Sequence, residues 1–206
     1  MKNKKNMRKG SLRKKYSEVS DFLGESRPYI IFTLILFGIF SIIGFIFPVF
    51  FVEQIGDLLQ NIEKEIDLMI SQFGFLGAIF FIMGNNILSS FISLVFGFFL
   101  GFAPIFSAVF NGYLLGFVSN FAVQEKGILV LWRLLPHGVF EFPAIIISIS
   151  LGIRLGTFFI FEKSKKNYPE RLKTIFKKSL LVFSLLVIPL LIVAGIIEGF
   201  LIFLID

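Results

Sequence analysis

The stretch LPHGVFEFPAI, residues 135–145, lies inside a long apolar segment and decides how this chain can fold. It contains the chain's one histidine, His137, four residues before Glu141, and Arg133 lies another four residues before His137. On a helix, this spacing places the three side chains on one face. Ionisable groups in hydrocarbon cost about 2.5–3.5 kcal/mol each on insertion scales, so we expect these side chains to have partners or a function.

The composition indicates an integral membrane protein. Of the 206 residues, 56% are hydrophobic, and the mean hydropathy is +0.87. Soluble domains contain about 45–50% apolar residues. The chain has no cysteine, which excludes disulfides and thiol chemistry. Its basic residues are concentrated in two segments beside apolar stretches, so we expect contact with the lipid bilayer and none with nucleic acid.

Five apolar stretches are long enough to cross a bilayer, which takes roughly 20 residues. They cover 29–51, 73–100, 103–123, 128–161 and 180–205. The fourth contains Pro136 and Pro143, which predict an interruption of its helix. The predicted fold class is therefore all-α: a polytopic membrane protein with five transmembrane helices, a proline-broken fourth span and one transmembrane domain over 30–206.

The distribution of lysine and arginine predicts the orientation in the membrane. Nine of the 20 basic residues lie in 1–29 and seven lie in 163–178. Cytoplasmic segments of membrane proteins carry such an excess. We therefore expect a basic cytoplasmic N-terminal segment, 1–29, a basic cytoplasmic loop, 162–178, and a multi-pass protein of the cell membrane whose N-terminus is cytoplasmic.

The acidic segment between the first two spans, 52–72, is predicted to form an outer amphipathic helix. Its apolar residues alternate spacings of three and four, which is typical of a helix with one apolar seam. The seam comprises Val52, Ile55, Leu59, Ile62, Ile66, Met69 and Phe73. Its predicted partner contacts are Ile55, Leu59, Ile62, Ile66 and Met69. Two interpretations stay open: the helix packs on its own bundle, or the seam contacts a partner, which would be a second copy of the chain or an extracytoplasmic protein.

Polar residues from four spans are expected at a similar depth in the outer half of the bilayer, because a helix rises about 1.5 Å per residue. This intramembrane polar cluster comprises Asn85, Asn86, Asn111, Arg133, His137, Glu141 and Glu198. Arg133 is either an anchor at the outer interface or the partner of Glu141 or Glu198. Arg154 lies deeper, and we expect it to extend to the cytoplasmic headgroups.

Three roles fit such a cluster. It can hold the helices together, as polar groups in membrane bundles often do. It can line a transport path, since broken helices near the midplane form ion and substrate sites. His137 with Glu141 and Glu198 could also ligate zinc, although there is no cysteine or second histidine to complete the set. No P-loop, dinucleotide-binding motif or nucleophile elbow is present. From the sequence we therefore assign no catalytic residues, no cofactor and no metal site.

Glycines recur at four-residue spacing, which predicts close helix crossings inside the bundle. The pairs are Gly97–Gly101, Gly112–Gly116, Gly152–Gly156 and Gly195–Gly199.

These motifs together resemble the stage II sporulation protein M family of integral membrane proteins. The first block is Gly84-Asn85-Asn86, Gly97, Gly101, Asn111-Gly112 and Gly116; the second is residues 135–144 with Gly152; Ala194 and Glu198 close the pattern. The resemblance spans about residues 30–200. In endospore formers it implies a membrane anchor for two peptidoglycan-degrading partners during engulfment. The family also extends to organisms that do not sporulate, archaea among them.

From this resemblance and the absence of a catalytic set, we expect a non-catalytic membrane scaffold that organises a membrane-associated complex. Its expected partners are membrane or extracytoplasmic proteins, which would be peptidoglycan hydrolases in a spore former, and a second copy of the chain. The alternative is a small membrane transporter or channel that uses the His/Glu/Asn cluster.

Overall fold

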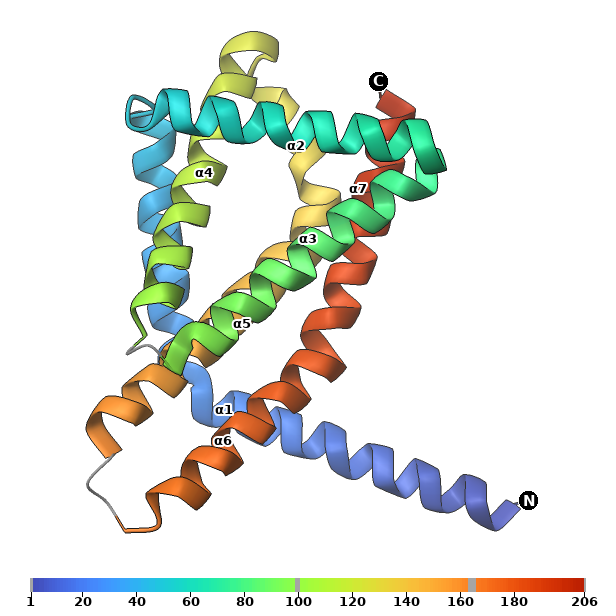
Figure 1. Cartoon of the computed structure of the whole chain (residues 1–206), viewed down its shortest axis with the longest axis vertical. Helices are drawn as coiled ribbons and strands as arrows, with labels where there is room; N and C mark the ends of the chain where they lie inside the picture. The colour runs from blue at the N-terminus through green and yellow to red at the C-terminus, as the bar shows by residue number, and fades with distance from the viewer. Residues whose placement is uncertain (1, 99–100, 163–165, 206) are drawn as a thin grey trace.

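The computed structural model describes residues 2–98, 101–162 and 166–205, and every regular element in these ranges is helical (Figure 1). Five helices of the described residues are long and apolar enough to cross a membrane. This confirms the predicted all-α fold with five spans. The elements are α1 (Lys2–Ile46), α2 (Val52–Phe73), α3 (Phe75–Val95) with a 3-10 turn (Phe96–Phe98), α4 (Phe102–Lys126), a 3-10 segment (Ile128–Leu134), α5 (Leu135–Glu162), α6 (Tyr168–Val182), a π-helical turn (Phe183–Val187) and α7 (Ile188–Ile205).

The first span and the basic N-terminal segment form one helix, α1, of 45 residues. Pro28 lies inside it. Proline removes one backbone hydrogen bond and kinks a helix, and α1 changes direction between its N-terminal arm and its steeper second half (Figure 1). Val19 and Phe22 of the arm are buried in the same hydrophobic cluster as α5, α6 and α7. The part of the arm from Val19 to Ser26 is therefore packed on the bundle.

The predicted amphipathic helix is α2, which lies across one end of the bundle (Figure 1). Gly74 follows it with a φ of 64° and a ψ of −157°, a backbone conformation open essentially to glycine alone, and this lets the chain turn directly into α3.

The apolar seam of α2 faces the protein's own helices. Ile55 is 1% exposed and packs with Tyr113 and Phe117 of α4. Ile62 and Ile66 are half-buried and line a cavity between the helices, and Met69 is half-buried where α3 begins. The prediction of partner contact is thus wrong for Ile55, because burial within the bundle leaves no surface to contact. Of the five predicted contact residues, Leu59 is exposed, at 37%, and the two end residues of the seam, Val52 and Phe73, are exposed as well.

The fourth span divides at Leu134–Leu135, immediately before Pro136, where the 3-10 segment gives way to α5. Pro136 therefore lies in the first turn of α5, where a proline costs no hydrogen bond. Pro143 does not end the helix, which continues through it to Glu162.

The basic segment 162–178 was expected to be a loop, but residues from Tyr168 onward form α6. Pro169 stands in the first turn of α6, a position that favours helix initiation. The π-helical turn then joins α6 to α7, so the last span is one helix from the basic segment to Ile205.

The paired glycines lie at helix crossings, as predicted. A Cβ atom on Gly97 would meet the carbonyl oxygen of Gly152 in α5, and one on Gly156 would meet the backbone of Gly101. Gly112 and Gly116 of α4 lie equally close to the backbone of α1, while Gly195 and Gly199 of α7 pack on Met83 and Ile79 of α3. These contacts are all within the bundle, so the glycine pairs bring its helices together.

Substituting Gly97 by alanine tests the crossing. We expect Gly97→Ala to lower the free energy of unfolding by about 1–3 kcal/mol, because the new methyl group overlaps the backbone of α5. Gly84→Ala in α3 is the matched control, since a Cβ there meets nothing within 4 Å. Thermal unfolding in detergent, followed by circular dichroism, should show a lower midpoint for the first variant alone. Equal unfolding midpoints for Gly97→Ala and Gly84→Ala would contradict the close approach of α5 to Gly97.

Candidate intramembrane ligand site

A cavity of about 290 Å³ lies among the helices below α2. Residues of α2, α3, α4, α5 and α7 line it. Most of its polar lining consists of amides and hydroxyls, with two carboxyl groups: Asn85, Asn86, Ser89, Ser90, Ser93, Ser107, Asn111, Glu141 and Glu198. Ile62 and Ile66 of α2 cover it on one side. Polar groups within a membrane span are costly in lipid, and this cavity is where the fold gathers them.

Three ionisable side chains of the predicted cluster meet beside this cavity: Glu141 and Glu198 line it, and His137 lies next to them. One ligand-forming atom from each of His137, Glu141 and Glu198 lies within 4.8 Å of the others. His137 and Glu141 stand one turn apart near the start of α5, and Glu198 reaches them from α7. The four-residue spacing placed the first two correctly, whereas the contact with Glu198 depends on the packing of α5 against α7.

Asn86 of α3 connects to this trio. Its Nδ2 donates a hydrogen bond of 2.9 Å to Oε1 of Glu141. In the described part of the chain, this is the hydrogen bond that holds the Glu141 carboxyl group. Two atoms of the trio have none: Nδ1 of His137 and Oε2 of Glu198 are buried without a hydrogen-bond partner.

The other asparagines of the predicted cluster line the same cavity but do not contact the acids. Asn111 of α4 bonds within its own helix, donating to the carbonyl oxygen of Ser107 at 2.8 Å and to its Oγ at 3.2 Å. Asn85 is exposed at the cavity margin. The cavity therefore brings these asparagines near the two acids, and the hydrogen bond that joins one of them to Glu141 comes from Asn86.

Arg133 does not join the cluster. It lies in the 3-10 segment before α5, and across residues 2–98, 101–162 and 166–205 it forms no ion pair with Glu141 or Glu198. Neither carboxyl group has a lysine or arginine partner in these ranges. Two acidic side chains therefore lie together inside the bundle without a positively charged side chain to balance them.

The serines that line the cavity are not among the residues predicted from the sequence. Ser93 donates a hydrogen bond of 3.0 Å to the carbonyl oxygen of Ser89 in its own helix. Its Oγ also lies 2.9 Å from Oγ of Ser107 on α4. The signal was present as spacing: Asn86, Ser89 and Ser93 recur at three and four residues along α3. Such a polar stripe on a membrane helix indicates a face turned away from lipid.

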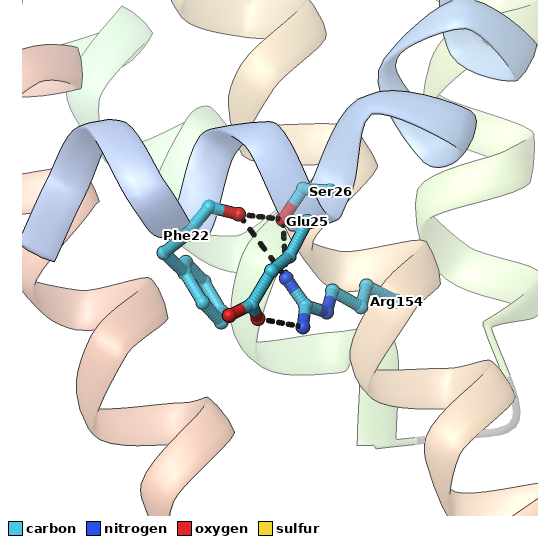
Figure 2. Close-up of polar contacts among 4 residues, drawn as sticks. All are labelled: Phe22, Glu25, Ser26 and Arg154. Atoms are coloured by element: carbon cyan, nitrogen blue, oxygen red, sulfur yellow. Dashed lines mark hydrogen bonds and ion pairs between the residues drawn. The ribbon is translucent and has the colours of Figure 1, made fainter.

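Arg154 forms a second polar site, away from the cavity (Figure 2). Its guanidinium donates to the carbonyl oxygen of Phe22 at 3.2 Å, to Oγ of Ser26 at 2.6 Å and to Oε2 of Glu25 at 2.8 Å. It also lies 4.1 Å from the centre of the Phe22 ring. The Arg154 side chain is 13% exposed. The expectation that it extends to the headgroups is wrong, because one turn of α1 satisfies it and so ties the N-terminal arm to α5.

Comparison with known proteins gives one family and one relative. The family described as Stage II sporulation protein M matches residues 31–201, a range that contains the whole polar cluster. An uncharacterized protein of Methanocaldococcus jannaschii, MJ0793, is 29% identical over 167 residues, which make up 77% of this chain and 88% of that protein. No solved structure matches the chain.

Replacing Glu198 distinguishes a cluster that holds the bundle together from one kept for a ligand. We expect Glu198→Leu to raise the free energy of unfolding by about 1–3 kcal/mol, because it removes a buried oxygen that has no partner. Glu65→Leu on the exposed face of α2 should change it by about 0.5 kcal/mol or less. Thermal unfolding in detergent measures both. A loss of stability in the Glu198 variant would show that the carboxyl group supports the fold.

Proposed function

Because the chain belongs to the stage II sporulation protein M family, a family of membrane proteins not known as enzymes, we propose a non-catalytic function centred on the cavity. In this proposal the protein is a small membrane transporter or channel. It binds a cation or a small polar solute between α3, α4, α5 and α7 and passes it across the bilayer. The N-terminal arm and α6 are on the cytoplasmic side, and α2 is outside.

The observation that carries this proposal is the unsatisfied state of the trio. Polar side chains that merely hold helices together are expected to satisfy one another, because an unpartnered buried group costs about 1–3 kcal/mol. Here Nδ1 of His137 and Oε2 of Glu198 have no partner, and both side chains place a ligand-forming atom within 4.8 Å of one on Glu141. Groups retained at such a cost within a membrane typically mark ion or substrate paths.

The shape of the cavity supports a path closed at one end. Its polar lining continues as far as the contact of Ser93 with Ser107. Beyond that contact, Gly97 and Gly152 bring α5 against the end of α3 so closely that no side chain fits between them. With α2 outside, the cavity would be accessible from the outer half of the membrane and closed toward the cytoplasm. If α5 moves away from the end of α3 at this glycine contact, the cytoplasmic half of the path would open.

The Glu141→Gln variant tests transport. We expect it to abolish flux in proteoliposomes, because the amide keeps the size of the side chain while removing its charge and one acceptor oxygen. Flux is followed with dyes for protons, potassium and zinc, and unfolding is measured on the same preparations. Glu65→Gln is the control, since Glu65 is exposed on α2 and is not among the residues that line the cavity. Flux that persists at the wild-type rate in Glu141→Gln would refute the proposal.

A second candidate function is the scaffold expected from the sequence. One feature favours it: beside the covered part of the seam, α2 has an exposed edge where Leu59 (37% exposed) and Ile70 (38%) flank a groove that Ile202 of α7 also lines. Apolar side chains on the outer surface suit contact with an extracytoplasmic protein. In a spore former, that protein would be a peptidoglycan hydrolase of the engulfment machinery.

The scaffold candidate predicts loss of a complex. We expect Leu59→Asp to abolish copurification of extracytoplasmic proteins with the tagged chain from its native membrane, because a charge is placed in the apolar edge. Leu68→Asp is the matched control. Leu68 is also exposed (46%), but it lies about two and a half turns along α2 from Leu59 and therefore on the opposite face of the helix. Identical sets of copurified proteins for both variants would exclude this edge as the contact.

A further inference from the structure

We propose that His137, Glu141 and Glu198 bind a divalent first-row transition-metal ion of the Zn²⁺ class between α5 and α7. The inference names the solute of the proposed transport site, and its role in transport rests on that proposed function. The binding itself rests on the geometry of the three side chains.

The donor set has the right chemistry and nearly the right spacing. Zinc is held by histidine nitrogen and carboxylate oxygen at about 2.0–2.2 Å, which sets neighbouring donor atoms roughly 3.3 Å apart in a tetrahedron. The three donor atoms here lie within 4.8 Å of one another. The proposal requires rotations of the side chains to close that difference.

The charge balance at the site also requires a cation. Glu141 and Glu198 lie together within the membrane span, and no arginine or lysine of the described chain pairs with either. Carboxylates in lipid are paired or coordinate a metal. A single divalent ion neutralises both at once and also provides the missing partners of His137 and Glu198. The competing solution, in which protons neutralise the carboxyl groups, leaves no role for the imidazole nitrogen that lacks a partner.

Two further features match metal sites. Asn86 donates to one oxygen of Glu141 and fixes its orientation, as outer partners of metal ligands commonly do. The protein supplies three ligands, and the site borders a cavity with room for water as the fourth. Structural zinc sites are closed by four protein ligands, whereas a site with an open position exchanges its fourth ligand. An open site suits an ion that must also leave.

The imidazole decides the class of ion. Magnesium and calcium prefer sites made of oxygen ligands, while imidazole nitrogen suits zinc, copper, iron and nickel. The site combines one histidine with two carboxylates, so we expect Zn²⁺ to bind much more tightly than Mg²⁺ or Ca²⁺.

Binding is tested on the full chain in detergent, stripped of metal and purified without a histidine tag. Titration with Zn²⁺ by calorimetry should give one ion for each chain. His137→Gln and Glu198→Gln should weaken binding at least tenfold, and Asn86→Ala about tenfold. Glu65→Gln and Glu125→Gln, which change exposed acids of α2 and α4, should leave the affinity unchanged. An affinity equal in the His137 variant and the wild type would overturn the proposal.

Nuclear magnetic resonance provides an independent readout that does not depend on the folding of any variant. His137 is the chain's one histidine, so labelling histidine with ¹⁵N gives the signals of a single imidazole. We expect one stoichiometric equivalent of Zn²⁺ to shift one ring nitrogen strongly, and a large excess of Mg²⁺ to leave it in place. Nitrogen signals that Zn²⁺ does not change would overturn the proposal.

The two proposals can fail separately. Zinc binding without zinc flux in proteoliposomes would support the metal site and contradict transport. Flux of protons or potassium that depends on Glu141, in protein that binds no Zn²⁺, would support transport and contradict the metal site.

Discussion

Hydrocarbon does not solvate polar groups, and this constraint organises the whole structure. A carboxyl group on a single lipid-facing helix would cost several kcal/mol, so each acid must find other helices. Glu141 and Glu198 do so at the junction of α5 with α7, where Asn86 of α3 and His137 join them. The helices can approach closely enough because glycines remove the side chains at their crossings. The polar cavity and the glycine contacts are thus two parts of one arrangement, with apolar packing closing one end of a hydrophilic space.

The amphipathic helix α2 takes part in this arrangement. With Ile55 buried against α4 and with Ile62 and Ile66 over the cavity, α2 shields the polar lining from one side. Its acidic residues stay at the exposed surface. The helix therefore joins the two sides of the bundle and also limits access to the trio. That double role explains why the apolar seam is continuous although only part of it is fully buried.

Sequence reasoning succeeded where a pattern has one physical cause. The five spans, α2 and the glycine crossings follow from apolar length, helical periodicity and small-residue spacing, and all are present. The four-residue spacing of His137 and Glu141 predicted their common face, whereas their contact with Glu198 depends on how α5 packs against α7. Reasoning failed where tertiary contacts decide. Charge alone could not show that Arg154 is satisfied by one turn of α1, or that the basic segment after α5 is helical from Tyr168. Nor could periodicity show which partner the seam of α2 faces, because a covered face and a docking face have the same pattern.

The uninterrupted helix from Tyr168 to Ile205 has a mechanical consequence. Lys178 near its basic end and Glu198 at the trio are 20 positions apart, which corresponds to about 30 Å along a helix. A helix transmits rotation about its own axis, so a torque on the charged end from lipid headgroups or another molecule also turns the Glu198 carboxylate. The π-helical turn at Phe183–Val187 lies between them, and such turns are frequent at functional sites. The basic end of this helix is thus mechanically coupled to a carboxyl group inside the bundle.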